Sequence, residues 1–418
     1  MSLFLVVCIV MGLTALFGFL NDRVLHLQQS IGLMILAVGF TFLLAALSAL
    51  GIFGDFEHFK DFVSQLSLND TLLNGLLCFL LFAGSVNVNL RELGEERRVI
   101  LTLAVGATLV GATLVGFGLW AVLGAFGIGL GLVYAFVFGA LISPTDPIAA
   151  LAILGKIGLP PRLEAIINGE SLFNDGVGVV IFTIALTVAM GTAQPSALDA
   201  LVLFLQEVLG GIALGLVASV VMHFMLSRTH DYGTQVLTSL SVVGLAYATA
   251  EHIEVSGPIA IVVTGLVMGN ITRPRLEKRK LFPLKTFWRA VDEGLNSIVF
   301  VLIGLHIALV QFSLLALLVA ACVIVICLIA RWLSVYITLG GLVRAGQLRA
   351  DLLGLSNLLT WGGLRGGLAI AMAMSLPNGP EKNLILEMTF CVVAFSLIVQ
   401  GLTIGKLFKA DSLSRLLK

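Results

Sequence analysis

The stretch Ser143-Pro-Thr-Asp-Pro147 lies within one of the most apolar segments of this 418-residue sequence, and Gly169-Glu-Ser-Leu-Phe-Asn-Asp-Gly176 lies within the next. Proline lacks a backbone N–H and clashes with the preceding helical turn, so a helix that enters the first stretch has to break there. A charged side chain at the centre of a bilayer costs roughly 2.5–3.5 kcal/mol on insertion scales. The acids in these two stretches therefore mark a functional site.

The composition of the whole chain is that of a membrane protein. It is 59% hydrophobic and only 11% charged, with a mean hydropathy of +1.08, whereas globular proteins carry about 25% charged residues. We predict an all-α polytopic membrane protein with one integral domain over residues 1–418. The five cysteines lie in apolar runs without a metal-like cluster, and we expect them to be reduced packing residues. Nothing in the sequence predicts a nucleic-acid partner.

Thirteen stretches meet the requirement of about 20 mainly apolar residues for a transmembrane helix. They cover residues 3–20, 31–50, 71–90, 99–123, 126–155, 163–190, 198–226, 235–251, 257–271, 294–310, 312–340, 351–376 and 385–408. We expect two inverted repeats, about 1–190 and 235–410, joined by a linker helix at 198–226. Spans five and twelve then occupy corresponding positions.

An odd number of spans puts the two termini on opposite sides of the membrane. With the N-terminus outside, 20 of the 24 Lys and Arg residues fall on the inner side, including the cluster Arg273–Arg289. Basic residues concentrate in cytoplasmic loops. We therefore predict an inner-membrane protein with a cytoplasmic C-terminus. Between Gly51 and Asp70 we expect either a short external surface helix or an ordered connecting loop.

The first break leaves backbone oxygens that need a partner. Pro144 and Pro147 remove the helical donors for the carbonyls of Ala140 and Ser143. Asp146 directly precedes Pro147, an arrangement typical of an N-cap followed by proline at the first helical position. Capping the second half-helix is one interpretation of Asp146, and a role in an ion site is compatible with it.

A second break is predicted at Trp361-Gly-Gly-Leu-Arg-Gly-Gly367 in span twelve. Its four glycines weaken the helix and allow other groups to approach closely. Paired, interrupted helices in two corresponding halves are the best sequence indication of a transporter site. Asp146 and Arg365 have the signs needed to offset the partial charges of half-helix ends where the two breaks cross.

Span six carries the candidate ion ligands. At 100° per residue, Ser171, Asn174 and Asp175 fall within an arc of about 100°, whereas Glu170 lies about 140° away from Asp175. Asp175 is near the middle of its span. We expect Glu170 to pair with Arg365, because an unpaired buried charge is costly. Arg331, near the end of its predicted span, is expected to reach the interface or to pair.

The predicted ligands suit a monovalent cation or a proton. Oxygen donors with one carboxylate favour a hard cation such as Na⁺ or Li⁺. The same carboxylate can bind H⁺, and either occupant leaves Asp175 neutral, whereas the empty anion has to lose its hydration to cross. Because the neighbour Asn174 is not a second acid, we predict one cation per proton and electroneutral exchange.

These motifs resemble the bacterial sodium/proton antiporters of the cation/proton antiporter 1 family, the NhaP and NHE group. The resemblance spans Leu72 to Leu407 and includes the run Val301-Leu-Ile-Gly-Leu305. It implies a thirteen-span homodimer that works by elevator-like alternating access and serves pH homeostasis without a cofactor.

By motif, the family implies a role for each site residue. Asp175 would be the shared Na⁺ and H⁺ carboxylate, with Asn174, Ser171 and Thr145 completing the site. Asp146 would compensate helix dipoles, and Glu170 with Arg365 would supply structural charge. One departure is that some bacterial relatives carry an acid in the third span, whereas Leu72 to Leu90 has none.

Two alternatives remain open from the sequence. A K⁺/H⁺ antiporter could use the same scaffold. A passive cation channel would need rings of acids or carbonyls around a pore, and one asymmetric Asn-Asp site argues against it. An enzyme is not expected, because no Ser/His dyad, paired catalytic acids or HExxH motif is present.

Overall fold

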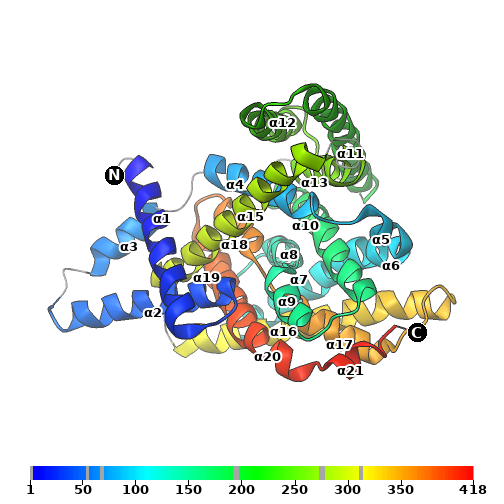
Figure 1. The fold of residues 1–418 in the computed structure, drawn as a ribbon. Coiled ribbons are helices and arrows are strands. Elements are labelled where there is room, and N and C mark those ends of the chain that lie inside the picture. Colours follow the sequence, from blue (N-terminus) through cyan, green and yellow to red (C-terminus); the bar gives the residue numbers. More distant parts are fainter. Residues whose placement is uncertain are drawn as a thin grey trace.

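The computed structural model describes residues 3–52, 56–65, 70–191, 197–272, 278–309 and 314–417. Within these ranges the chain forms helices and two isolated bridges, with no strand (Figure 1). Eight of the described helices are long and apolar enough to cross a membrane, and shorter apolar helices cover Gly75–Ser85, Leu132–Ile142 and Gly257–Thr272. Together these helices make the chain a multi-pass membrane protein.

The first half of the chain forms α1 (Leu3–Leu20), η1 (Asn21–Leu25), α2 (Gln29–Ala49), α3 (Phe56–Gln65), α4 (Asp70–Ser85), α5 (Leu90–Glu95), α6 (Arg97–Leu101), η2 (Thr102–Ala107), α7 (Thr108–Ala125), α8 (Leu132–Ile142), α9 (Ile148–Lys156) and α10 (Pro161–Ala189). The second half forms α11 (Ala197–Arg228), α12 (Tyr232–His252), α13 (Gly257–Val267), η3 (Met268–Thr272), α15 (Lys278–His306), η4 (Ile307–Leu309), α16 (Leu314–Arg344), α17 (Leu352–Gly362), α18 (Gly367–Met374), α19 (Pro380–Phe395), η5 (Ser396–Gln400), α20 (Gly401–Leu407) and α21 (Ala410–Leu413).

Every predicted span contains at least one of these helices, so the predicted all-α polytopic fold is confirmed. Of the two alternatives between Gly51 and Asp70, the short helix is present, as α3. One boundary differs in a way that matters for the site. The sequence predicts span ten from residue 294, but α15 begins at Lys278 because its basic first half buries Leu284 and Trp288 on one face. The first five residues of the basic cluster, 273–277, lie outside the described residues.

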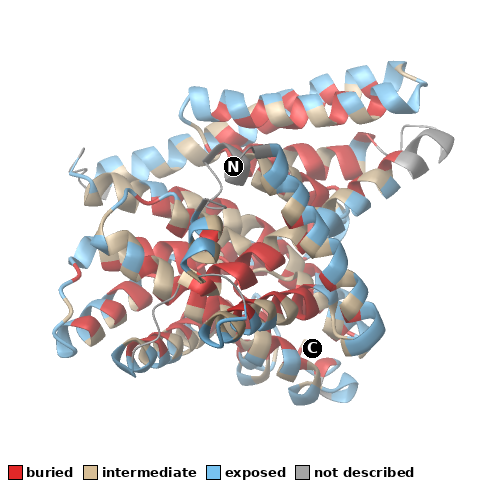
Figure 2. Cartoon of the chain, turned by 90° about the vertical axis from the view of Figure 1, so that its left-hand side faces the viewer, coloured by how far each residue is buried: buried red, intermediate tan, exposed pale blue. Residues whose placement is uncertain are grey.

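The helices pack into two units, each with its own apolar core. In the first, which we call the crossing unit, α7–α10 and α16–α20 surround one large apolar core. In the second, the flanking unit, α4, α12, α13 and the first half of α15 share a separate core with the end of α11. A third cluster joins α1, α2 and α3 to the end of α15. Figure 2 shows the buried residues between the helices and the exposed ones on outer faces.

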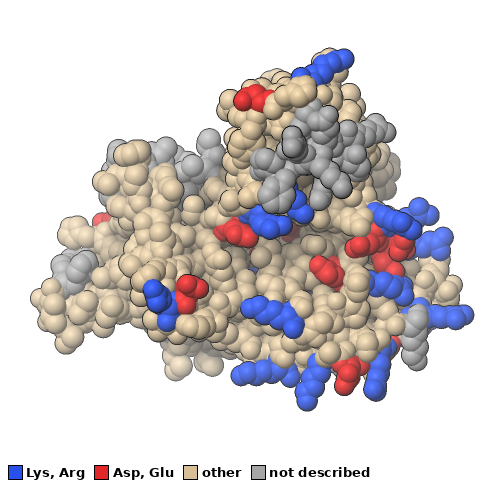
Figure 3. All heavy atoms as spheres, in the orientation of Figure 1, with Lys and Arg blue, Asp and Glu red and all other residues tan. Residues whose placement is uncertain are grey.

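The outer surface separates apolar from charged regions. Large apolar side chains are exposed along α11, from Leu198 to Met225, as expected for a helix in contact with lipid. Lys and Arg side chains instead gather along the side of the molecule that carries α5, α6 and the C-terminus (Figure 3). The long helices thus expose apolar surface over their length, and many of the basic side chains lie on one side of the molecule.

Candidate functional site

The first predicted break separates α8 from α9. The helix stops at Ile142 and resumes at Ile148, with Pro144 and Pro147 in the intervening segment. Asp146 Oδ1 accepts a hydrogen bond from the backbone N–H of Ile148 (2.9 Å). The Asp146 carboxylate therefore lies at the N-terminus of α9, where the helix dipole favours a negative charge.

The second break separates α17 from α18 and meets the first. The Asp146 N–H donates to the Leu364 carbonyl (2.7 Å), forming a single antiparallel bridge between the two breaks. Gly366 allows this approach, because a Cβ there would lie 2.6 Å from Asp146 Oδ2. The predicted crossing of two interrupted helices is confirmed, and a side chain at Gly366 would force the two segments apart.

The free carbonyls at the breaks receive hydrogen bonds from side chains of the crossing unit. The Arg365 guanidinium donates to the carbonyls of Ser143 and Pro144, the latter at 2.9 Å. Gln400, in the π-helical turn η5, donates to the carbonyls of Thr360 and Trp361 at the end of α17 (3.3 and 3.4 Å). Unsatisfied carbonyls are costly away from water, so these contacts make the breaks tolerable in a membrane.

The buried ion pair differs from the prediction. Glu170 pairs with Arg331, whose guanidinium donates to both carboxylate oxygens (2.8 and 2.9 Å). Both side chains are at least 96% buried. The predicted pairing with Arg365 is wrong, since Arg365 is directed at the carbonyls of the first break. Because α16 continues to Arg344, Arg331 lies well inside its helix and opposite Glu170 rather than near an interface.

Two polar residues of α10 tie that helix to the first break. The Ser171 hydroxyl donates to the Thr145 carbonyl. The Asn174 amide donates to Thr145 Oγ1 (2.9 Å) and to Glu170 Oε1 (3.0 Å), and its oxygen accepts from the Thr145 N–H (3.4 Å). Asn174 is fully buried. Its amide thus joins the break to the ion pair, and Asn174 does not line the cavity that Asp175 faces.

Asp175 lies in the middle of α10 and faces a cavity between the two units. The cavity has a volume of about 310 Å³ and is lined on the crossing-unit side by Thr145, Asp146, Ser171 and Asp175. Among the described residues, none forms an ion pair or hydrogen bond with the Asp175 carboxylate. Asp175 is half-buried. It is therefore an acid in the middle of a long apolar helix that a small cation or proton could reach.

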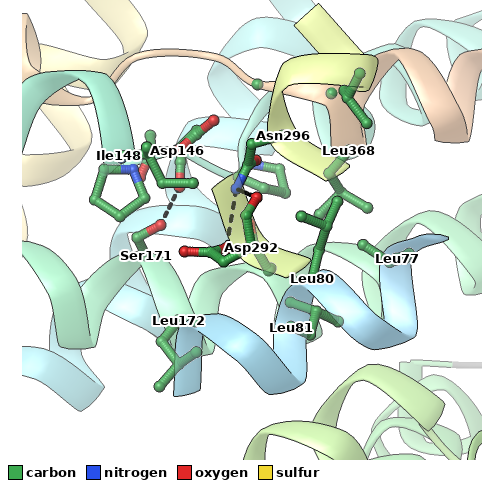
Figure 4. Close-up of a pocket in the computed structure, with 18 of the residues that line it drawn as sticks. Leu77, Leu80, Leu81, Asp146, Ile148, Ser171, Leu172, Asp292, Asn296 and Leu368 are labelled. Atoms are coloured by element: carbon green, nitrogen blue, oxygen red, sulfur yellow. Dashed lines mark hydrogen bonds between the residues drawn. The ribbon is translucent and has the colours of Figure 1, made fainter. Parts of the chain in front are cut away.

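The flanking unit supplies two polar residues that sequence reasoning missed. Asp292 and Asn296 on α15 line the same cavity, opposite Asp146 and Ser171 (Figure 4). The Asn296 amide donates to Asp292 Oδ1 (2.9 Å). Both lie one turn apart, a spacing that would have indicated a shared helical face had the span been extended back into its basic segment.

Comparisons with known proteins show which family and which fold this chain resembles. A family profile described as "Sodium/hydrogen exchanger, transmembrane" matches residues 13–410. The chain is 37% identical over 402 residues to the Na⁺/H⁺ antiporter NhaP of Pseudomonas aeruginosa, covering 95% of this chain and 94% of that protein. It is 34% identical over 345 residues to NhaH of Halobacillus dabanensis, covering 81% and 82%. The sodium proton antiporter MjNhaP1 of Methanocaldococcus jannaschii shares the fold, with a TM-score of 0.74 at 18% identity over 97% of this chain and 98% of that one.

Proposed function

This chain belongs to the sodium/hydrogen exchanger family, and from that premise we propose that it is a secondary active antiporter exchanging Na⁺ or Li⁺ for H⁺. The observation that carries the proposal is the Asp175 carboxylate, which faces the cavity without a cationic partner while Glu170, on the same helix, is neutralised by Arg331. Asp175 is therefore free to bind an ion, whereas Glu170 is not. No covalent chemistry and no cofactor enter this mechanism.

In the proposed cycle Na⁺ and H⁺ compete for Asp175. Thr145 and Ser171 line the cavity beside it, and their oxygens would complete the coordination of the cation. Asn174 does not line the cavity, but it holds Thr145 in position. It does so through hydrogen bonds to the side chain and the backbone N–H of Thr145. A carboxylate occupied by either ion is neutral and crosses at lower cost than the bare anion. Because one carboxylate takes one ion at a time, the exchange is electroneutral.

The alternating exposure of Asp175 is supported by a second cavity on the other side of the site. Its volume is about 740 Å³, and it is lined by Glu207, Tyr247 and the second half of α10, whereas the first cavity reaches Asn168 in the first half. Leu77, Leu368 and Ala371 line both cavities and form the apolar wall between them. We propose that the crossing unit slides along the flanking unit, as in an elevator, and moves Asp175 past this wall.

The orientation follows from the charges. We place the charged side that carries α5, α6 and the C-terminus in the cytoplasm and the N-terminus outside, since basic residues favour the inner face. The cavity that contains Asp175 then opens toward the cytoplasm. We further propose that the protein is a homodimer in the inner membrane and that the basic cluster Arg273–Arg289 contacts anionic lipid.

Exchange in membrane vesicles tests the proposed function. Everted vesicles that have been acidified inside and loaded with a pH-sensitive dye are given Na⁺, Li⁺ or K⁺ in turn. We expect Na⁺ and Li⁺ to restore fluorescence rapidly, without dependence on membrane potential. Recovery with K⁺ alone would instead support K⁺/H⁺ exchange, and cation flux without proton movement would indicate a channel and refute the proposal.

A further inference from the structure

The first cavity contains one acid that the proposed mechanism does not use. Asp292 comes from α15 in the flanking unit, whereas Asp146 and Asp175 come from the crossing unit. Residues 292, 296 and 299 follow the i, i+4, i+7 spacing of one helical face, and all three line the cavity. A Cβ added at Gly367 would lie 2.2 Å from Val299 Cγ1, so this face is in contact with the second break.

The Asp292 carboxylate is held in place but not neutralised. Asn296 donates to Oδ1 (2.9 Å) and to the Asp292 carbonyl (3.0 Å), which fixes the rotamer and leaves Oδ2 without a described donor. Among the described lining residues of the cavity there is no Lys, Arg or His. Figure 4 shows Asp292 directed into the space that Asp146 and Ser171 face from the opposite side. A cavity with acids and no bases concentrates cations within it.

We propose that Asp292, oriented by Asn296, is a second cation-receiving carboxylate that takes a partly hydrated monovalent cation before it reaches Asp175. This inference rests on the proposed function and adds a residue to the same pathway. No described group of three His, Cys, Asp or Glu residues is close enough to hold one metal ion. Asp292 is therefore a separate cation-binding position, and the three acids Asp146, Asp175 and Asp292 do not form one binding site.

The position of Asp292 on the flanking unit gives it a specific role. If the crossing unit slides, Asp175 moves and Asp292 stays, so the two carboxylates are neighbours in one state of the cycle only. Asp292 then raises the apparent affinity for the cation on the side to which this cavity opens. It leaves the exchange ratio unchanged, because the competition between Na⁺ and H⁺ occurs at Asp175.

The substitution Asp292→Asn tests the proposal, because Asn keeps the shape and removes the charge. Glu293→Gln is the matched control, since Glu293 is the adjacent acid on α15 but is exposed and does not line the cavity. We expect the KM for Na⁺ in everted vesicles to rise by about threefold to tenfold in Asp292→Asn, with an unchanged maximal rate, because the local attraction for cations is lost. Asp292→Glu should recover most of the loss, and Glu293→Gln should match the wild type.

Two results would overturn the inference. One is a wild-type KM in Asp292→Asn. The other is a loss of maximal rate at constant KM, which indicates a structural role for Asp292.

Failure of the proposed function is recognised separately. The Na⁺ concentration that half-maximally raises the Tm of the purified protein, with choline replacing Na⁺ at constant ionic strength, reports binding without transport. A wild type that is stabilised by Na⁺ but exchanges no protons refutes the proposed function. The inference about Asp292 then stands if Asp292→Asn raises this concentration, and falls if it does not or if Na⁺ gives no stabilisation at all.

Discussion

Two faces of α10 carry an acid each, and their surroundings are opposite. Glu170 is 2% exposed and receives two hydrogen bonds from Arg331 and one from Asn174. Asp175, less than two turns away, faces a cavity whose described lining contains acids and no bases. Both acids belong to the same helix and are five residues apart. Only the partners that other helices bring to each face differ.

This difference separates structural charge from functional charge. A buried carboxylate with a bidentate Arg partner is satisfied and has little tendency to exchange its partner for an ion. A carboxylate without such a partner is costly when empty, so it binds whichever cation or proton reaches it. The following four substitutions test this contrast.

Asp175→Asn should have the largest effect. The amide cannot bind a proton or neutralise a cation, so we expect Na⁺-dependent proton flux in vesicles to fall to the background of empty vesicles. The variant should elute from a sizing column as the wild type does, because no described partner is lost. Exchange at the wild-type rate would show that the cavity acid is not the shared site.

Glu170→Gln should mainly affect stability. It leaves the Arg331 guanidinium buried without its counter-ion, which typically costs about 3–5 kcal/mol. We expect a lower Tm and a lower yield in membranes. The double variant Glu170→Met with Arg331→Met should recover part of the loss, since it buries no charge.

A Glu170→Gln protein with the wild-type Tm but without transport would contradict the contrast. It would move Glu170 from the structural group to the ion pathway.

Asn174→Asp should have an intermediate effect, because Asn174 connects the two faces. A carboxylate cannot donate to Thr145 Oγ1 or to Glu170 Oε1, and losing such buried hydrogen bonds costs about 1–3 kcal/mol. We expect a lower Tm and an altered ratio of H⁺ to Na⁺, measured as a dependence of exchange on membrane potential. Unchanged stability and an electroneutral ratio together would mean that Asn174 neither fixes the break nor sets the stoichiometry.

Asp231→Ala should have the smallest effect. It is the control for an acid that lies outside the two faces of α10. Asp231 is exposed and caps α12, and the Thr234 N–H that donates to its carboxylate (2.7 Å) lowers its pKa. A carboxylate whose pKa is lowered by folding stabilises the fold at pH values above the ordinary pKa of Asp. This stabilisation is lost as the pH falls through the pKa of the folded state. We expect a slightly lower Tm near neutral pH, convergence with the wild type in acid, and unchanged exchange. Loss of exchange would show that charge outside the cavity also controls transport.

Local sequence rules predicted much of the site. Pro144 and Pro147 required a break, the glycines around Arg365 indicated a second one, and helical spacing separated Glu170 from Asp175. These predictions depend on neighbours along the chain, whose geometry is nearly independent of the rest of the fold. Asp292 was missed because the apolar run, and with it the predicted span, begins two residues after it.

The sequence by itself determined the membrane class, the two breaks and an acid in the middle of a span, because composition, proline geometry and helical periodicity are properties of the chain. The tertiary structure alone decided which charges meet. Glu170 pairs with Arg331, 161 residues away in sequence. Arg365 donates to the free carbonyls of the first break, and Asp292 faces the cavity of Asp175. Partner choice depends on which helices pack together and at what depth, and a helical wheel gives the direction of a side chain but not what lies opposite it.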